Sequence, residues 1–137
     1  MLARAQSSRD HRSAAATPPV DARAVAVGVA VTFLLTVAVS AVLAVVIYFT
    51  EMTEAHVAGA LYYIGLVAVT FGGASASRRA GKSGLLHGAL SGAAYVILSL
   101  AAGALLFPGS DVLAGALGKM VTGAAAGALG GVVGINL

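Results

Sequence analysis

Four long apolar stretches, separated by short polar connections, dominate this sequence. They run near residues 24–50, 56–77, 84–107 and 111–135. A helix needs about 20 apolar residues to cross the hydrocarbon core of a bilayer, and each stretch is long enough to do so. The sequence therefore predicts an all-α, polytopic membrane protein, a bundle of four transmembrane helices.

The composition supports lipid as the solvent of this chain. Of its 137 residues, 59% are hydrophobic and only 9% are charged, and the mean hydropathy is +0.96. Soluble domains carry about 25% charged residues, and so few charges cannot cover a water-exposed surface. Residues 1–22 differ, because they hold Arg4, Arg9 and Arg12 in a polar, Ser/Ala-rich context. We expect a disordered basic cytoplasmic tail over 1–22 and a transmembrane domain over 23–137.

A cleaved signal peptide is the alternative interpretation of the N-terminus. The apolar region of a signal peptide runs roughly 7–15 residues. The first apolar stretch of this chain, near residues 24–50, is about twice that length. On that difference we expect the first helix to be retained in the membrane.

Basic residues are distributed unevenly between the connections. All eight Lys and Arg residues except Lys119 lie before the first stretch or between the second and third, where Arg78, Arg79 and Lys82 form a basic loop. Cytoplasmic connections of membrane proteins carry the excess of Lys and Arg. Both termini and this loop are therefore expected in the cytoplasm, an N-in/C-in topology. The loop is also expected to contact anionic lipid headgroups.

Two other classes of partner are disfavoured by context. The pI near 9.7 could suggest a nucleic-acid partner, but the cations cluster at the ends of membrane spans. Residues 76–83 fit a relaxed phosphate-binding-loop pattern, yet such a loop needs a preceding β-strand and an acid that holds Mg²⁺. The sequence contains no cysteine that could form a disulfide or ligate a metal. We expect no nucleic acid, nucleotide or cofactor.

Small residues form stripes along the last three predicted helices. Residues spaced by four lie on one helical face, and small residues let helices in lipid approach closely. We expect these three helices to pack tightly, with the first helix on the outside. The stripes are either used within one bundle, or one of them holds a partner or a second copy. The predicted packing positions are Gly65, Gly72, Gly73, Gly84, Gly88, Gly92, Gly115, Gly123, Gly127 and Gly131.

Lys119 lies inside an apolar stretch, on the small-residue stripe of the fourth helix. A lysine at the centre of a span costs roughly 2.5–3.5 kcal/mol, so its side chain should face protein rather than lipid. One interpretation is that it extends to an outer carboxylate, with Glu51, Glu54 and Asp111 as candidates. The other interpretation is a contact with an ion or a substrate.

His87 and Ser91 are one helical turn apart in the third predicted helix. Their pairing could suggest a serine nucleophile, but no orienting carboxylate lies at that depth and no G-x-S-x-G turn is present. We therefore expect interhelical hydrogen bonds from these two side chains. His56, beside Glu54, matches no specific metal-binding spacing. The sequence predicts no catalytic or metal site.

Short motifs follow one another in a particular order through the last three helices. They are the Gly72–Gly73 pair, the basic loop 78–83, the spacing Gly84-x-x-x-Gly88 and the run Gly-Gly-Val-Val-Gly-Ile-Asn at 130–136. In these motifs the chain resembles small bacterial four-helix membrane proteins of the YrzE type, a domain of unknown function. The resemblance implies a location in the bacterial cytoplasmic (inner) membrane, and it supplies no catalytic residues. The basic tail lies outside it.

Two functional classes remain for a protein of this kind. The first is a non-catalytic scaffold or accessory subunit that packs against itself or against a larger membrane protein complex. The second is a homo-oligomeric small transporter or channel, with Lys119, Ser91, Ser99 and Thr122 near the pathway. Four helices rarely enclose a pore alone, so the second class requires several copies.

Overall fold

The computed structural model describes residues 20–50, 54–108, 111 and 114–137. These residues form four helices, α2 over Ala22–Phe49, α3 over Glu54–Ala80, α4 over Gly84–Leu106 and α5 over Ala116–Asn136, and the described residues contain no strand. By length and composition, each helix is able to cross a membrane. The predicted all-α class with four membrane-spanning helices is confirmed.

The first helix begins two residues earlier than the sequence predicts, because Asp21 caps it. One carboxylate oxygen of Asp21 accepts hydrogen bonds from the backbone N–H groups of Arg23 (2.9 Å) and Ala24 (3.3 Å). An aspartate at this position satisfies N–H groups that have no partner within the helix. Ala22, placed in the predicted tail, is therefore helical. Residues 1–19 of that tail lie outside the described residues.

The last helix begins at Ala116, five residues later than the predicted start at 111. Gly115 precedes it with a φ of 68°, a left-handed conformation that glycine adopts at little cost. Asp111 lies in a turn, where its carbonyl accepts a hydrogen bond from the N–H of Ala114 (2.9 Å). The apolar pattern alone does not reveal the turn at Ala114 and Gly115, because alanine and glycine also recur throughout the helix that follows.

The second helix extends three residues beyond its predicted end at 77 and includes Arg78 and Arg79 in its last turn. Cations at this position interact favourably with the negative end of the helix dipole. The chain then reverses through Gly81 (φ 63°) and Ser83 (φ 49°), both left-handed. Within the predicted basic loop, residues 78–80 therefore form the end of α3, and residues 81–83 form a tight turn.

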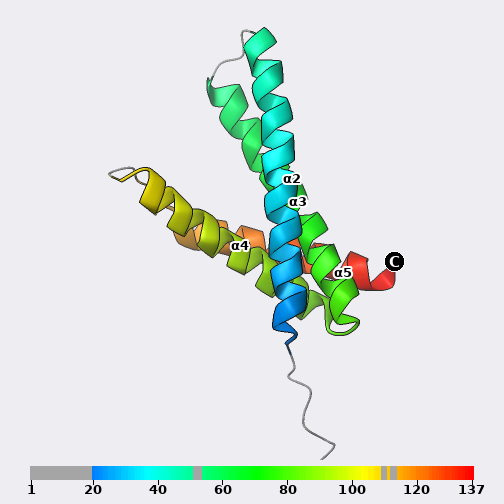
Figure 1. Cartoon of the computed structure of the whole chain (residues 1–137). Helices are drawn as coiled ribbons and strands as arrows, with labels where there is room; N and C mark the ends of the chain where they lie inside the picture. Colours follow the sequence, from blue (N-terminus) through cyan, green and yellow to red (C-terminus); the bar gives the residue numbers. More distant parts are fainter. Residues whose placement is uncertain (1–19, 51–53, 109–110, 112–113) are drawn as a thin grey trace, which may run out of the picture.

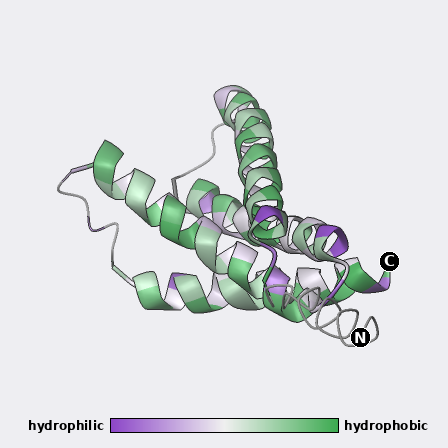
Figure 2. Ribbon diagram, turned by 60° about the horizontal axis from the view of Figure 1, so that its bottom comes forward, coloured by the Kyte–Doolittle hydropathy of each residue, from purple (hydrophilic) through white to green (hydrophobic). Residues whose placement is uncertain are grey.

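The four helices form two hairpins, α2–α3 and α4–α5, that cross near the turn at residues 81–83 (Figure 1). We call this the joined end of the molecule. The opposite ends of the two hairpins point in different directions in both views (Figures 1 and 2), and we call them the open ends. Within the described residues, α2 contacts α3 and α4 but not α5, and α5 contacts α3 and α4 but not α2. Because α2 packs along α3 as extensively as α5 does, these contacts do not set the first helix apart as the outer one.

The interior is built from small and polar side chains. The largest fully buried side chains are His87, Thr32, Ser77 and Ser91, and the buried apolar residues are Ala24, Ala68, Val69, Ala76 and Ala126. Large apolar side chains are exposed along all four helices, and Figure 2 shows hydrophobic residues throughout the four ribbons. This distribution is typical of a protein in lipid, where burying a leucine gains little over leaving it against acyl chains.

Three helix backbones meet at Gly127 of α5. A Cβ atom on Gly88 of α4 or on Gly73 of α3 would overlap the carbonyl group of Gly127, and a Cβ on Gly127 would overlap the carbonyl of Gly88. Side chains at these three positions would force the helices apart. The absence of side chains is therefore what permits this crossing.

Other glycines extend the same contacts toward both ends of the crossing. The close pairs are Gly92 with Gly123, Gly84 with Gly131, Gly28 with Gly72, Gly130 with Thr70 and Gly134 with Ala74. Two predicted packing positions, Gly65 and Gly115, lie outside these contacts, because no neighbouring atom lies within 4 Å of their Cβ positions. Gly115 is the left-handed residue before α5, and Gly65 lines a pocket between α3, α4 and α5.

Candidate functional site

Buried polar side chains gather at the joined end, where His87 connects α4 to α2. The backbone N–H of Asp21 donates to Nε2 of His87 (3.0 Å), and Nδ1 of His87 lies 3.1 Å from the carbonyl oxygen of Ser83. Because a backbone N–H only donates, Nε2 must be the acceptor, and Nδ1 carries the proton that is donated to Ser83. Both ring nitrogens of this fully buried imidazole are therefore occupied.

Two buried serines beside this contact differ in their partners. The hydroxyl of Ser77 on α3 donates to the carbonyl oxygens of Gly84 (2.7 Å) and Gly73 (2.9 Å), and so connects α3 to the start of α4. The hydroxyl oxygen of Ser91 on α4 is buried without a hydrogen-bond partner. It lies against Gly28, where an added Cβ would collide with it. His87 and Ser91 share a helix face, but no hydrogen bond joins them.

Thr32 and Arg78 complete the polar contacts of the joined half. The hydroxyl of buried Thr32 donates to the carbonyl of Gly28 within α2 (3.0 Å), and its oxygen lies against Gly72 of α3, where an added Cβ would collide with it. Nε of Arg78 donates to the carbonyl of Gly134 (3.3 Å) and so ties the end of α3 to the end of α5. The predicted topology residue Arg78 therefore also has a structural contact, whereas Arg79 is exposed at the helix end.

A cavity of about 320 Å³ lies between α3, α4 and α5, on the side of the crossing toward the open ends. Its walls are mostly apolar. The polar residues that line it are Tyr62, Tyr95, Ser99, Lys119 and Thr122, and Lys119 is the only charged one among them. We call this space the Lys119 cavity.

Two hydroxyl groups that line the Lys119 cavity have hydrogen-bond partners in the structure, one within its own helix and one on another helix. Thr122 donates to the carbonyls of Gly118 (3.0 Å) and Lys119 (3.1 Å), so its oxygen can still accept a hydrogen bond. The hydroxyl of Tyr95 donates to that of Thr36 on α2 (3.2 Å). The structure thus brings together Lys119, Ser99 and Thr122, as the transporter hypothesis expects. It separates them from Ser91, which lies in the helix crossing.

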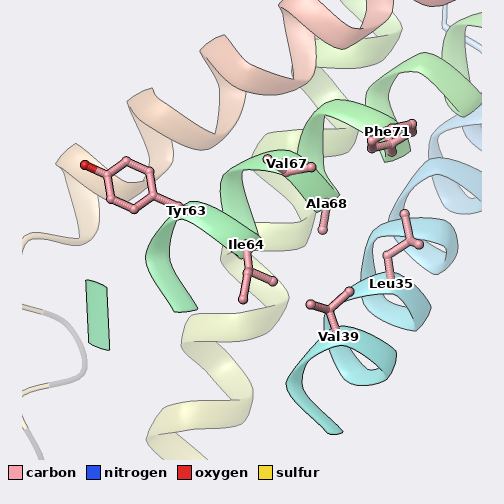
Figure 3. A pocket seen from close by; sticks show the side chains of 7 residues that line it. All are labelled: Leu35, Val39, Tyr63, Ile64, Val67, Ala68 and Phe71. Carbon is pink, nitrogen blue, oxygen red and sulfur yellow. The ribbon is translucent and has the colours of Figure 1, made fainter. Parts of the chain in front are cut away.

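A second groove, between α2 and α3, is apolar throughout its length (Figure 3). It measures about 330 Å³ and is lined by Leu35, Val39, Tyr63, Ile64, Val67, Ala68 and Phe71. The ring of Tyr63 points away from α2, so its hydroxyl does not enter the groove. A surface of this kind offers no hydrogen bond or charge to a ligand.

The described residues hold no group of three His, Asp or Glu side chains placed to bind a metal. Of the predicted carboxylate partners of Lys119, Glu51 lies outside the described residues, and Asp111 lies in the turn before α5. The capping role of Asp21 was not predicted, although an aspartate directly before an apolar stretch is a helix-start signal. The roles of Thr32 and Ser77 were not predicted either, because hydroxyl residues in spans are too common to single out.

A family model described as a protein of unknown function (DUF3792) matches residues 21–134. The match begins at the capping residue of α2 and ends at Gly134, so it covers α2, α3 and α4 in full and all but the last two residues of α5, and it excludes the basic tail. No curated protein and no solved structure matches the chain.

Proposed function

The chain belongs to the DUF3792 family of proteins of unknown function, and we propose that it is a non-catalytic scaffold or accessory subunit that assembles through helix packing. Within that family we assign it to the YrzE type, on the order of its glycine and basic motifs. That assignment supports a location in the bacterial cytoplasmic membrane. Four helices long and apolar enough to span make it a multi-pass membrane protein.

Two helical glycines on faces without neighbours carry this proposal. Gly59 on α3 and Gly118 on α5 are exposed, and no atom of another helix lies within 4 Å of their Cβ positions. Glycine within a helix costs roughly 1 kcal/mol relative to alanine, and at these positions no contact inside the chain compensates for it. In lipid, small residues let a further helix approach closely. Both faces therefore suit a transmembrane helix from outside the chain.

A second copy of the chain is the occupant that fits these faces. Gly59 lies near the start of α3, and Gly118 lies near the start of α5, so both are close to open ends. When two copies of the chain insert in the same orientation, the Gly59 face and the Gly118 face of each copy lie at the same depth in the membrane. Symmetric assemblies place like surfaces against one another, which these two faces permit.

The contacts of His87 and Ser91 support the absence of catalysis. A serine nucleophile requires a base that accepts its proton. Here both ring nitrogens of His87 are engaged by Asp21 and Ser83, and the Ser91 hydroxyl has no partner. This geometry favours a structural role for the pair.

Single-cysteine crosslinking tests the assembly, since the chain has no native cysteine. Gly59→Cys and Gly118→Cys, each purified and reconstituted in vesicles, should form disulfide-linked dimers on mild oxidation. Leu34→Cys, on α2 and 68% exposed, is the matched control and should stay monomeric. A cysteine at position 127 would not report on assembly, because Gly127 faces α3 and α4 of its own chain. Equal dimer yields at all three positions, or none at 59 and 118, would contradict the proposal.

A small homo-oligomeric transporter is the second candidate function, and the grouping of Lys119, Ser99 and Thr122 in one cavity favours it. Anion flux through reconstituted vesicles is the relevant measurement. Flux that falls in Lys119→Met but not in Lys82→Met would support transport. Absence of flux above that of protein-free vesicles would leave the scaffold as the better account.

A further inference from the structure

We propose that the Lys119 cavity binds an anionic membrane phospholipid, with the phosphate at Lys119 and an acyl chain against α3 and α4. This goes beyond the scaffold function, because the cavity is formed within one chain and needs no second copy. The inference follows from the distribution of charge and apolar surface in the cavity and from the position of Lys119 in its helix.

The positive charge of the cavity is concentrated at one place. Among the described residues that line it, Lys119 is the only charged one, and the hydroxyls of Ser99 and Thr122 line the same space. An ammonium group and hydroxyls together can hold a phosphate by charge-assisted hydrogen bonds. The oxygens of a phosphate accept hydrogen bonds. The Thr122 hydroxyl already donates its proton within α5, so the Lys119 ammonium and the Ser99 hydroxyl are the donors to the phosphate.

The start of α5 reinforces this charge. Lys119 is the fourth residue of the helix, and Gly115 before it provides no side-chain cap. The first N–H groups of a helix have no partner within it, and the helix dipole places a partial positive charge there. Lys119 lies within about 5 Å of that helix start by helical rise. An anion at Lys119 therefore also benefits from the helix terminus.

The remainder of the cavity suits a hydrocarbon chain. Leu61, Leu66, Val96 and Leu100 contribute its walls, and Val69, only 3% exposed, lies where the cavity approaches the helix crossing. Gly65 lines the same space and leaves room for a chain, since nothing lies within 4 Å of its Cβ position. A free phosphate ion would leave these apolar walls unfilled, whereas a phospholipid matches both parts.

Lys119 lies at a depth in the membrane where its side chain can contact a lipid headgroup. The first turn of a membrane-spanning helix lies near the boundary between hydrocarbon and headgroups, where Lys and Tyr side chains are commonly found. Tyr62 lines the cavity beside Lys119 and is 53% exposed. The phosphate of a lipid in the same leaflet reaches this boundary, and its acyl chain extends inward along α3 and α4.

Native mass spectrometry of the full chain in detergent tests the proposal, with phosphatidylglycerol or phosphatidylcholine of matched acyl chains as the probe. We expect the wild type to retain phosphatidylglycerol in preference to phosphatidylcholine. Lys119→Met should weaken phosphatidylglycerol binding about tenfold, as expected for the loss of a charge-assisted hydrogen bond. Arg23→Met removes the same charge from the start of α2, at the joined end away from the cavity, and should bind as the wild type does.

A second variant tests the apolar part of the cavity without changing its charge. Gly65→Leu places a side chain into the cavity while Lys119 remains, and it should also reduce retention. Gly59→Leu, on the same helix but outside the cavity lining, is its control. Equal retention of both lipids, or equal loss in Lys119→Met and Arg23→Met, would overturn the proposal. Displacement of the lipid by millimolar inorganic phosphate would also overturn it, because the site would then be selective for the ion.

Discussion

The backbone N–H of Asp21 and Nε2 of His87 lie 3.0 Å apart and join the start of α2 to the first turn of α4. Asp21 has two roles at this point. Its carboxylate caps α2, and its own N–H is bound by a side chain from another helix. The imidazole in turn donates to Ser83 in the turn that connects the hairpins. This contact therefore couples the beginning of the membrane domain to the joined end.

Replacing His87 should loosen the attachment of α2. His87→Leu removes the acceptor for the Asp21 N–H and should lower the free energy of unfolding by about 1–3 kcal/mol, the usual cost of an unsatisfied buried group. His87→Gln retains an acceptor oxygen and should recover part of the loss. Unfolding in mixed micelles measures both variants. Equal stability of His87→Leu and the wild type would contradict a structural role for this hydrogen bond.

The two buried serines should respond oppositely to alanine. Ser77→Ala removes the donor to Gly84 and Gly73 and should destabilise the protein by about 1 kcal/mol. Ser91→Ala removes a buried hydroxyl that has no partner, so the variant should be as stable as the wild type or more stable. The same unfolding assay compares them. A larger loss for Ser91→Ala would show that its hydroxyl has a partner in the membrane.

Replacement of glycine by alanine should destabilise the protein at the helix crossing but not on an exposed helix face. Gly127→Ala forces the backbones of α4 and α5 apart and should cost about 1–3 kcal/mol, as overpacking does. Gly118→Ala meets no neighbour and should be neutral or stabilising by up to about 1 kcal/mol in the monomer. Thermal unfolding of both variants is measured in detergent, under conditions in which the protein is monomeric. Similar effects of the two substitutions would be evidence against the backbone contact at Gly127.

The charge distribution makes a separate prediction about orientation. In intact cells, a membrane-impermeant maleimide should label Glu51→Cys but not Lys82→Cys, because positive residues remain on the cytoplasmic side. Permeabilised cells should give labelling at both positions, which controls for reactivity. The reverse pattern in intact cells would place the basic turn outside.

Much of the fold follows from the amino-acid pattern because a bilayer leaves few alternatives. A chain in lipid must satisfy its backbone within each span, so long apolar stretches become helices. The sequence therefore determines the number of helices, their approximate bounds and the all-α class. Where it missed a bound, as at α5, the cause was the left-handed Gly115, whose conformation leaves no mark in the apolar pattern.

Only the tertiary structure decided which residues contact one another. Gly65 and Gly73 both belong to the predicted small-residue positions of one helix, yet Gly73 lies against Gly127 while Gly65 lines a cavity. The difference arises because the hairpins cross near their joined end and diverge beyond it. Likewise, no local pattern links Asp21 to His87, which are 66 residues apart. Helix formation depends on neighbours along the chain, but these contacts depend on how two hairpins fit against each other, and only the assembled structure sets that fit.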